Sequence, residues 1–115
     1  MSDAATAIDM THLSRYTGGD KALENEILSI FEHQTELWMR LLDPNAPDDA
    51  WKDAAHSLKG SAKGVGAWAV ADLCEKAEAL VGDELKVRAV RSVLLDELRS
   101  ALNAAVDEVR RLRSA

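Results

Sequence analysis

The stretch AAHSLKGSAKGVGAWA, residues 54–69, contains a helix and the point at which that helix ends. Asp48 or Asp49 begins this helix, and alanine, leucine and lysine favour its continuation. Gly64 and Gly66 are typical of a helix end followed by a tight turn. After the turn, apolar residues again recur at helical spacing, at Val70, Leu73, Ala77 and Leu80. The stretch therefore predicts a hairpin of two antiparallel helices.

The residues before this hairpin predict a short helix and a long one. Residues 9–17 form the short helix, which two glycines end, and Asp20 caps the long helix. The long helix stops at residues 43–49, because the two prolines of this link cannot continue a helix. We expect its buried face to hold the apolar residues that recur at helical spacing, Leu23, Ile27, Ile30, Phe31, Trp38, Leu41 and Leu42.

The residues after the hairpin predict one more long helix. Residues 82–84 turn the chain, and the last helix then runs to about residue 113. Its predicted inward residues are Val90, Val93, Leu94, Leu98, Leu102, Ala105, Val109 and Leu112. Short links make neighbouring helices antiparallel. The sequence thus predicts an all-α fold, an antiparallel up-down four-helix bundle with a short leading N-terminal helix. Residues 1–115 are predicted to form a single domain, with residues 1–8 as a loose N-terminal tail.

The composition of the chain narrows the classes of function. With 14 basic and 20 acidic residues, the net charge is -6, which disfavours a nucleic-acid partner. No apolar run is long enough to predict a membrane span, and the N-terminus lacks the pattern of a signal peptide. Cys74 is the single cysteine, so no intramolecular disulfide forms and we expect a reducing, cytoplasmic location.

His56 stands apart from the apolar face of its helix. On a wheel of about 100° per residue, the apolar positions share one arc and His56 lies on the solvent side. Lys52, Lys59 and Lys63 surround it, and the residue one turn on is Gly60. A glycine here costs about 0.5–1 kcal/mol relative to alanine, and nothing in the fold itself requires it. The missing side chain leaves room for another molecule to approach His56.

These residue types suit phosphoryl transfer. A neutral histidine has one unprotonated ring nitrogen, which is a nucleophile. Neighbouring lysines favour the neutral ring, and they also neutralise the charge of a phosphoryl group attached to it. The histidine, the lysines and the cleared approach together predict a phosphoryl carrier.

The segment HSLKGSAKGVGA resembles the signature of histidine-containing phosphotransfer (HPt) domains. That signature has lysine at +3 from the histidine, glycine at +4, small residues next and glycine at +10, here Gly66. The similarity continues in LCEKAEAL (73–80), and GGDKALENEILSIF (18–31) is similar to the second helix of the family. The resemblance covers about residues 9–82 by motif and the last helix by architecture.

The resemblance implies a role for each site residue. His56 would accept a phosphoryl group from an aspartyl phosphate of a receiver domain, Lys59 would lie near the phosphate, and Gly60 would mark where the receiver approaches. The family often places a Gln or Glu on the next helix against the other ring nitrogen. Glu78, at +22 from the histidine, holds that position, and Glu75 is the competing candidate. A hairpin that turns near residue 65 also brings this region beside His56.

The resemblance also implies partners. The protein would be a monomer that carries phosphoryl groups between the receiver domains of a hybrid sensor kinase and a response regulator. It would use no cofactor, since any Mg²⁺ belongs to the receiver, and no metal or membrane. The chain is too short for an ATP-binding lobe, so we expect a phosphocarrier with no autonomous kinase activity. Lys63 and Trp68 have no assigned role.

Two other functions stay open at this point. A helical docking module would bind a receiver or kinase domain without carrying phosphate, and it would not need the histidine. A dimerisation domain of a sensor kinase would favour two long helices and a dimer, so the mass in solution separates it from a monomeric carrier. GVGAWA (64–69) imitates a dinucleotide-binding fingerprint, but no predicted strand precedes it. His12, His33 and His56 lack the spacing of metal ligands, and a lone Cys74 does not complete a zinc site.

Overall fold

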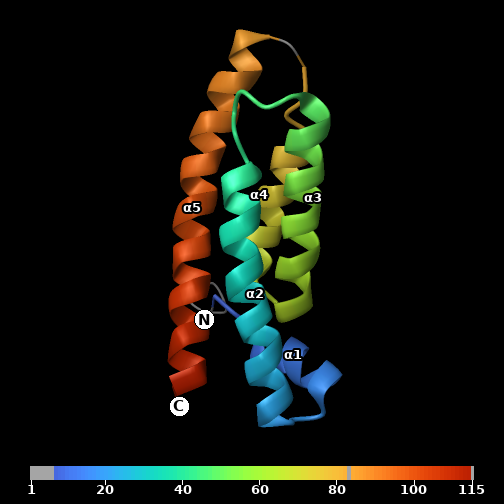
Figure 1. Cartoon of the computed structure of the whole chain (residues 1–115), viewed down its shortest axis with the longest axis vertical. Helices are drawn as coiled ribbons and strands as arrows, with labels where there is room; N and C mark the ends of the chain where they lie inside the picture. The colour runs from blue at the N-terminus through green and yellow to red at the C-terminus, as the bar shows by residue number, and fades with distance from the viewer. Residues whose placement is uncertain (1–6, 83, 115) are drawn as a thin grey trace.

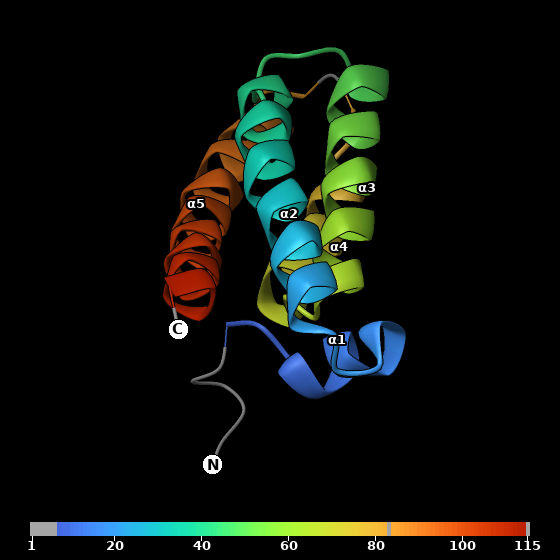
Figure 2. The same ribbon diagram turned by 60° about the horizontal axis from the view of Figure 1, so that its bottom comes forward.

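The computed structural model describes residues 7–82 and 84–114, which contain helices and no strand (Figure 1). The helices are α1 (Met10–Thr17), α2 (Lys21–Leu41), α3 (Asp48–Val65), α4 (Trp68–Glu78) and α5 (Leu85–Ser114). The helices α2 to α5 stand side by side as a bundle, and α1 lies across one end of it (Figure 2). The predicted four-helix bundle with a short leading helix is confirmed. Most of the predicted N-terminal tail lies outside the described residues.

Local capping signals place the helix ends close to where the sequence predicts them. Asp9 and Asp20 each accept a hydrogen bond from the backbone N–H three residues on, at 3.1 and 3.2 Å, and so begin α1 and α2. Gly18 and Gly66 end α1 and α3 in the left-handed conformation. These signals act within one helical turn, which is why the sequence alone locates them.

Gly66 also brings the segment before α1 against the α3–α4 turn. The N–H of Asp9 donates to the carbonyl of Gly66 at 3.0 Å, and a Cβ on Gly66 would lie 2.6 Å from the Cβ of Asp9. Gly64 differs, because it lies inside α3 and a Cβ there would meet nothing within 4 Å. Gly66 is thus the glycine that ends α3, and Gly64 lies in the last turn of that helix.

The core includes residues that the sequence pattern placed outside it. Ile8, in the predicted tail, is fully buried. On α2, Leu28 and the carboxylate-bearing Glu24 are buried, and the hydroxyls of Ser14 and Thr17 donate to Glu24 at 3.2 and 2.8 Å. These hydrogen bonds let a carboxylate lie inside the junction of α1 and α2.

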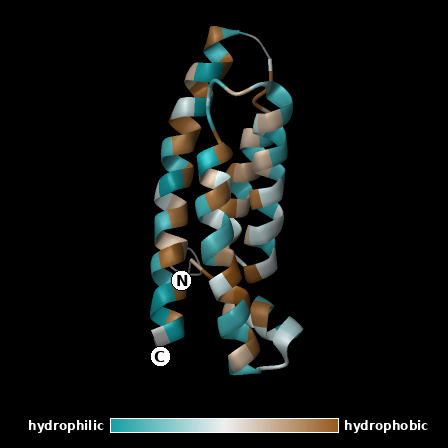
Figure 3. Cartoon of the chain, viewed as in Figure 1, coloured by the Kyte–Doolittle hydropathy of each residue, from teal (hydrophilic) through white to brown (hydrophobic). Residues whose placement is uncertain are grey.

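Several residues predicted to face inward are exposed instead. They are Leu23, Ile30 and Leu41 on α2 and Val90 and Val93 on α5. Both helices carry apolar residues on more than one face, and Figure 3 shows apolar and polar segments alternating along them. Periodicity alone does not choose between such faces, whereas packing against the neighbouring helices does.

The α2–α3 and α4–α5 links lie at the same end of the bundle (Figure 1), and a buried arginine forms hydrogen bonds to both. Arg91 of α5 is 1% exposed and donates to the carbonyls of Leu80, Pro44 and Ala46 at 2.8–3.1 Å. Its other amino group donates to Asp48 at 2.6 Å, and Asp48 also accepts the N–H of Gly82. The bond from Gly82 and the guanidinium hold the pKa of Asp48 below its usual range. One side chain thus ties both links to the start of α3.

Candidate functional site

The side chain of His56 projects from the middle of α3 and is 72% exposed. Its Nδ1 lies 2.9 Å from Oε1 of Glu78, the last residue of α4. The other predicted partner, Glu75, is exposed one turn earlier on α4. The structure therefore brings Glu78, the residue at +22 that the family resemblance indicated, to the imidazole.

Glu78 is held by a second group, the ammonium of Lys59. Lys59 Nζ lies 3.1 Å from both carboxylate oxygens, and the two side chains are only 14% and 17% exposed. Burial raises the pKa of Glu78, but the hydrogen bonds from Lys59 and His56 outweigh it and lower the pKa below its ordinary value. Glu78 is thus an ionised carboxylate that spans α3 and α4.

An ionised carboxylate at Nδ1 decides how the neutral ring of His56 is protonated. A carboxylate only accepts hydrogen bonds, so Nδ1 carries the proton and donates it to Glu78. The lone pair of the neutral ring then lies on Nε2, at the outer edge of an exposed side chain. The arrangement can present a fixed nitrogen nucleophile to a molecule that approaches from solvent.

The lysines near His56 divide into two groups. Lys59 is turned inward to Glu78, whereas Lys52 and Lys63 are exposed on the outer surface of α3. The sequence predicted that Lys59 lies near a phosphate, and in this structure its ammonium contacts the carboxylate that orients the histidine. Its contact with Glu78 depends on a residue 19 positions away, which no local pattern reveals.

Gly60 leaves open space beside the histidine. A Cβ built at this position would meet nothing within 4 Å, and the same holds at Gly64 one turn further on. Both glycines are exposed. His56, Gly60 and Gly64 follow one another at four-residue spacing, so they share one face of α3.

Trp68 finds a partner that the sequence did not indicate. Its Nε1 donates to Oδ2 of Asp9 at 3.0 Å, and its ring contacts His12 edge to face, with centroids 4.8 Å apart. His12 in turn contacts Tyr16. This cluster fixes α1 to the start of α4 and gives His12 a structural role.

Three further observations concern the cysteine, metal binding and membrane spans. Burial raises the pKa of the Cys74 thiol to about 12, so this cysteine is a packing residue and not a nucleophile. Across residues 7–82 and 84–114, no group of three or more His, Cys, Asp or Glu side chains is placed to hold a metal ion. None of the helices described there is both long and apolar enough to cross a membrane.

Fold and site together define a helical bundle that displays an oriented, solvent-facing histidine on α3. The family model described as "Hpt domain" matches residues 21–112. The chain therefore belongs to the Hpt domain family, and its role is histidine phosphotransfer in a phosphorelay.

A solved structure supports the same assignment. The chain is similar to the histidine phosphotransferase ShpA from Caulobacter crescentus, with 35% sequence identity and a TM-score of 0.71. The match covers 91% of this chain and 88% of that one. No curated protein matches the sequence.

Proposed function

We propose that His56 is the residue that carries the phosphoryl group, which it exchanges with aspartates of receiver domains. The single observation that carries this proposal is the hydrogen bond of 2.9 Å between His56 Nδ1 and Glu78. It leaves Nε2 as the exposed nucleophile, whereas nothing comparable holds His33, whose Nδ1 contacts the carbonyl of Ser29 in its own helix.

The proposed transfer is a displacement at phosphorus. The Nε2 lone pair attacks the phosphorus of an aspartyl phosphate, the bond to the aspartate oxygen breaks, and the electron pair leaves with that carboxylate. The phosphorylated ring, still protonated on Nδ1, is a cation, and the carboxylate of Glu78 stabilises it. The reverse step returns the group to a second receiver. The step requires no cofactor on this chain, and any Mg²⁺ belongs to the receiver.

We propose the lysines as the charge complement of this group. Lys59 stabilises the phosphorylated state mainly through Glu78, while Lys52 and Lys63 offer exposed positive charge one and two turns from the histidine. An aspartyl phosphate arriving within a receiver is anionic, so these charges favour its approach.

The docking surface proposed for the receiver lies on α2 and α3. Leu23, Ile30, Leu37 and Leu41 expose 38–52% of their surface along one face of α2. Gln34, on the same face, accepts a hydrogen bond from Ser61 at 2.9 Å, so this apolar stripe adjoins α3 next to Gly60. An apolar stripe beside a cleared, basic face suits a partner that must bind and then release.

The remaining features of the proposal concern assembly and location. We propose a monomer, because four helices of one chain close the core, which disfavours a kinase dimerisation domain that needs two chains. The location proposed is the cytoplasm, a reducing compartment in which a single unpaired cysteine is ordinary. The mass in solution tests the first of these statements.

The experiment that tests the function is phosphoryl transfer from purified, phosphorylated receiver domains. We expect the protein to take up an acid-labile, base-stable label, as a phosphohistidine does, and the His33→Gln control to behave identically. His56→Gln should fold normally, since exposed substitutions usually change stability by under about 0.5 kcal/mol. It should take up no label, and acid-labile label on that variant would refute the assignment.

A further inference from the structure

Trp51 links the histidine helix to the end of the helix that carries Glu78. It lies on α3, is 1% exposed, and its Nε1 donates to the carbonyl of Ala77 at 2.7 Å. Ala77 directly precedes Glu78, the last residue of α4. The bond therefore fixes the main chain next to the carboxylate that contacts His56.

The place of this bond matters because helix ends are poorly held. The last four carbonyls of a helix lack a regular intrahelical donor, and that of Ala77 is otherwise met by the N–H groups of Ala79 and of Leu80, the latter at 3.0 Å. The indole N–H adds a shorter bond from a rigid, buried ring. It joins the main chain of the turn that carries Glu78 directly to α3.

Arg91 holds the indole in this position. Its guanidinium lies over the Trp51 ring, 4.8 Å from the centroid, and its Nε donates to the carbonyl of Leu80 at 2.8 Å. Arg91 thus braces both the ring and the residues that follow α4.

We propose that Trp51 is a positioning residue for phosphotransfer: its indole N–H fixes the last turn of α4 so that Glu78 meets Nδ1 of His56. The inference rests on the proposed role of His56. Three side chains of α3 then bond to this turn: Trp51 to its main chain, and His56 and Lys59 to the carboxylate of Glu78. The bond from Trp51 keeps the carboxylate in place, and the bond from His56 selects the tautomer that leaves Nε2 free.

The test follows the protonation of the His56 ring by nitrogen NMR in Trp51→Phe. Loss of the N–H should move the neutral ring from the Nδ1–H toward the Nε2–H tautomer, by about two- to tenfold in the ratio, the factor expected for one ordinary hydrogen bond. Labelling by a small phosphodonor should slow by a similar factor. Trp68→Phe is the matched control, because it removes an indole hydrogen bond at the opposite end of α4 and should change neither quantity.

A second arm separates positioning from general destabilisation. If Trp51 acts through Glu78, Trp51→Phe should have no further effect on the tautomer ratio in a Glu78→Ala background. If Trp51→Phe does not fold, the benzothiophene analogue of tryptophan at position 51 keeps the two-ring shape without the N–H. An unchanged tautomer ratio in Trp51→Phe or the analogue would overturn the inference, as would an equal effect with and without Glu78.

The readouts also distinguish this inference from the function on which it rests. The tautomer ratio is measured without any phosphodonor. Absence of label from the wild-type protein would refute the function of His56, while the NMR comparison would still decide whether Trp51 positions Glu78.

Discussion

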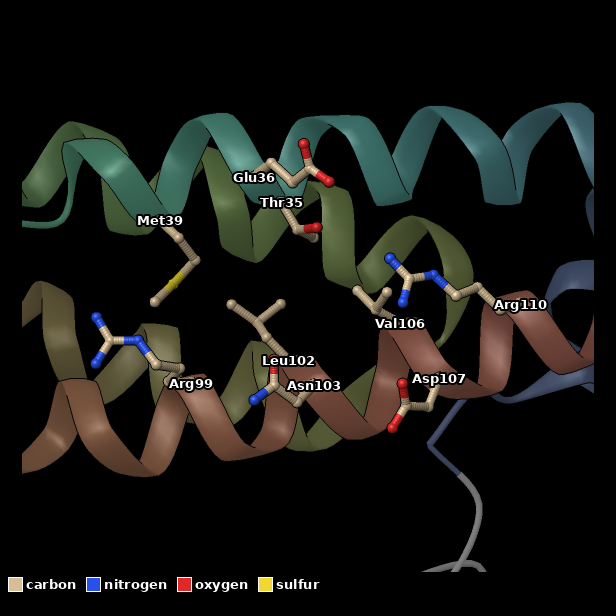
Figure 4. A pocket seen from close by; sticks show the side chains of 9 residues that line it. All are labelled: Thr35, Glu36, Met39, Arg99, Leu102, Asn103, Val106, Asp107 and Arg110. Atoms are coloured by element: carbon tan, nitrogen blue, oxygen red, sulfur yellow. The ribbon is translucent and has the colours of Figure 1, made fainter.

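The helix pairs α3–α4 and α2–α5 are built from different side chains. The buried faces of α3 and α4 are rich in small residues, namely Ala54, Ala55, Ala62, Ala71, Cys74 and Ala77. Between α2 and α5 lies a pocket of about 570 Å³, into which Met39, Leu102 and Val106 project while Glu36, Arg99, Asp107 and Arg110 form its rim (Figure 4). Small side chains let helix backbones approach, so a polar side chain of one helix can reach the other directly.

This difference decides where a site of fixed geometry can lie. Across α3–α4, the contacts of Trp51, His56 and Lys59 with α4 are 2.7–3.1 Å long. Across α2–α5, the described polar contacts join exposed arginines to Glu32 at the surface. Exposed ion pairs contribute little and tolerate movement, whereas the α3–α4 contacts include the buried bond of Trp51 and the partly buried bond of Lys59. The histidine lies on the pair whose geometry is held.

The largest expected effect comes from removing the brace at the end of α3–α4. Arg91→Met should lower the free energy of unfolding by about 2–4 kcal/mol, because buried carbonyls lose their donor and an ion pair is broken. Arg99→Met is the matched control, since Arg99 is 57% exposed and pairs with Asp96 at 3.6 Å on the α2–α5 side. It should cost less than about 0.5 kcal/mol. Equal losses in urea denaturation would remove the distinction between the two pairs.

The same substitution in the two regions compares their packing directly. Val70→Ile adds one methylene to a side chain of α4 that is 1% exposed, and overpacking should cost about 1–3 kcal/mol. Val106→Ile adds the same group at the α2–α5 pocket, where it should be neutral or stabilise by up to about 1 kcal/mol. Thermal unfolding of both variants measures the difference. A larger loss for Val106→Ile would show that the pocket is not the looser region.

A side chain at Gly60 should separate stability from function. Gly60→Gln should raise stability by up to about 1 kcal/mol, because glutamine is the better helix former and open space surrounds the position. Transfer from a receiver should slow about tenfold, equivalent to about 1.4 kcal/mol, because bulk stands where the partner arrives. Labelling by a small phosphodonor should change much less.

Gly64→Gln provides the control for Gly60→Gln. It is the same change one turn further from His56, with equally open space around it. The gain in melting temperature should match that of Gly60→Gln, and the loss of receiver transfer should be smaller. Normal receiver transfer by Gly60→Gln would place the approach surface elsewhere.

The smallest expected effect concerns Lys59 and acid. In the folded protein the pKa of Glu78 is lowered, so its contribution to stability is complete above the ordinary glutamate pKa of about 4.3 and disappears as the pH falls through the lowered value. Lys59→Ala should cost about 0.5–1 kcal/mol at neutral pH. It should also raise the pKa of Glu78 and so reduce the loss of stability on acidification below pH 4.

The measurement for Lys59 is urea unfolding from pH 7 to pH 3. Lys63→Ala, an exposed lysine on the same helix, is the control and should show the wild-type pH dependence. A Lys59→Ala variant with unchanged acid sensitivity would mean that Lys59 does not lower the pKa of Glu78.

Much of the bundle could be predicted because its signals are local. Asp20, Gly18 and Gly66 act on backbone groups within one turn, and the prolines of the α2–α3 link exclude a helix regardless of what surrounds them. The outward position of His56 relative to its own helix is local in the same sense. What failed was the choice of the buried face on α2 and α5, since Leu23 and Val93 sit at helical spacing yet are exposed.

The sequence by itself determined the helices, their order and the phosphotransfer motif around His56, because each depends on residues a few positions apart along one helix. Only the tertiary structure decided that Glu78 rather than Glu75 meets the imidazole, that Lys59 turns inward and that Arg91 is buried against the ring of Trp51. Those contacts join residues 19 to 40 positions apart. They depend on how far each helix is rotated about its axis, and packing of the whole core sets that rotation.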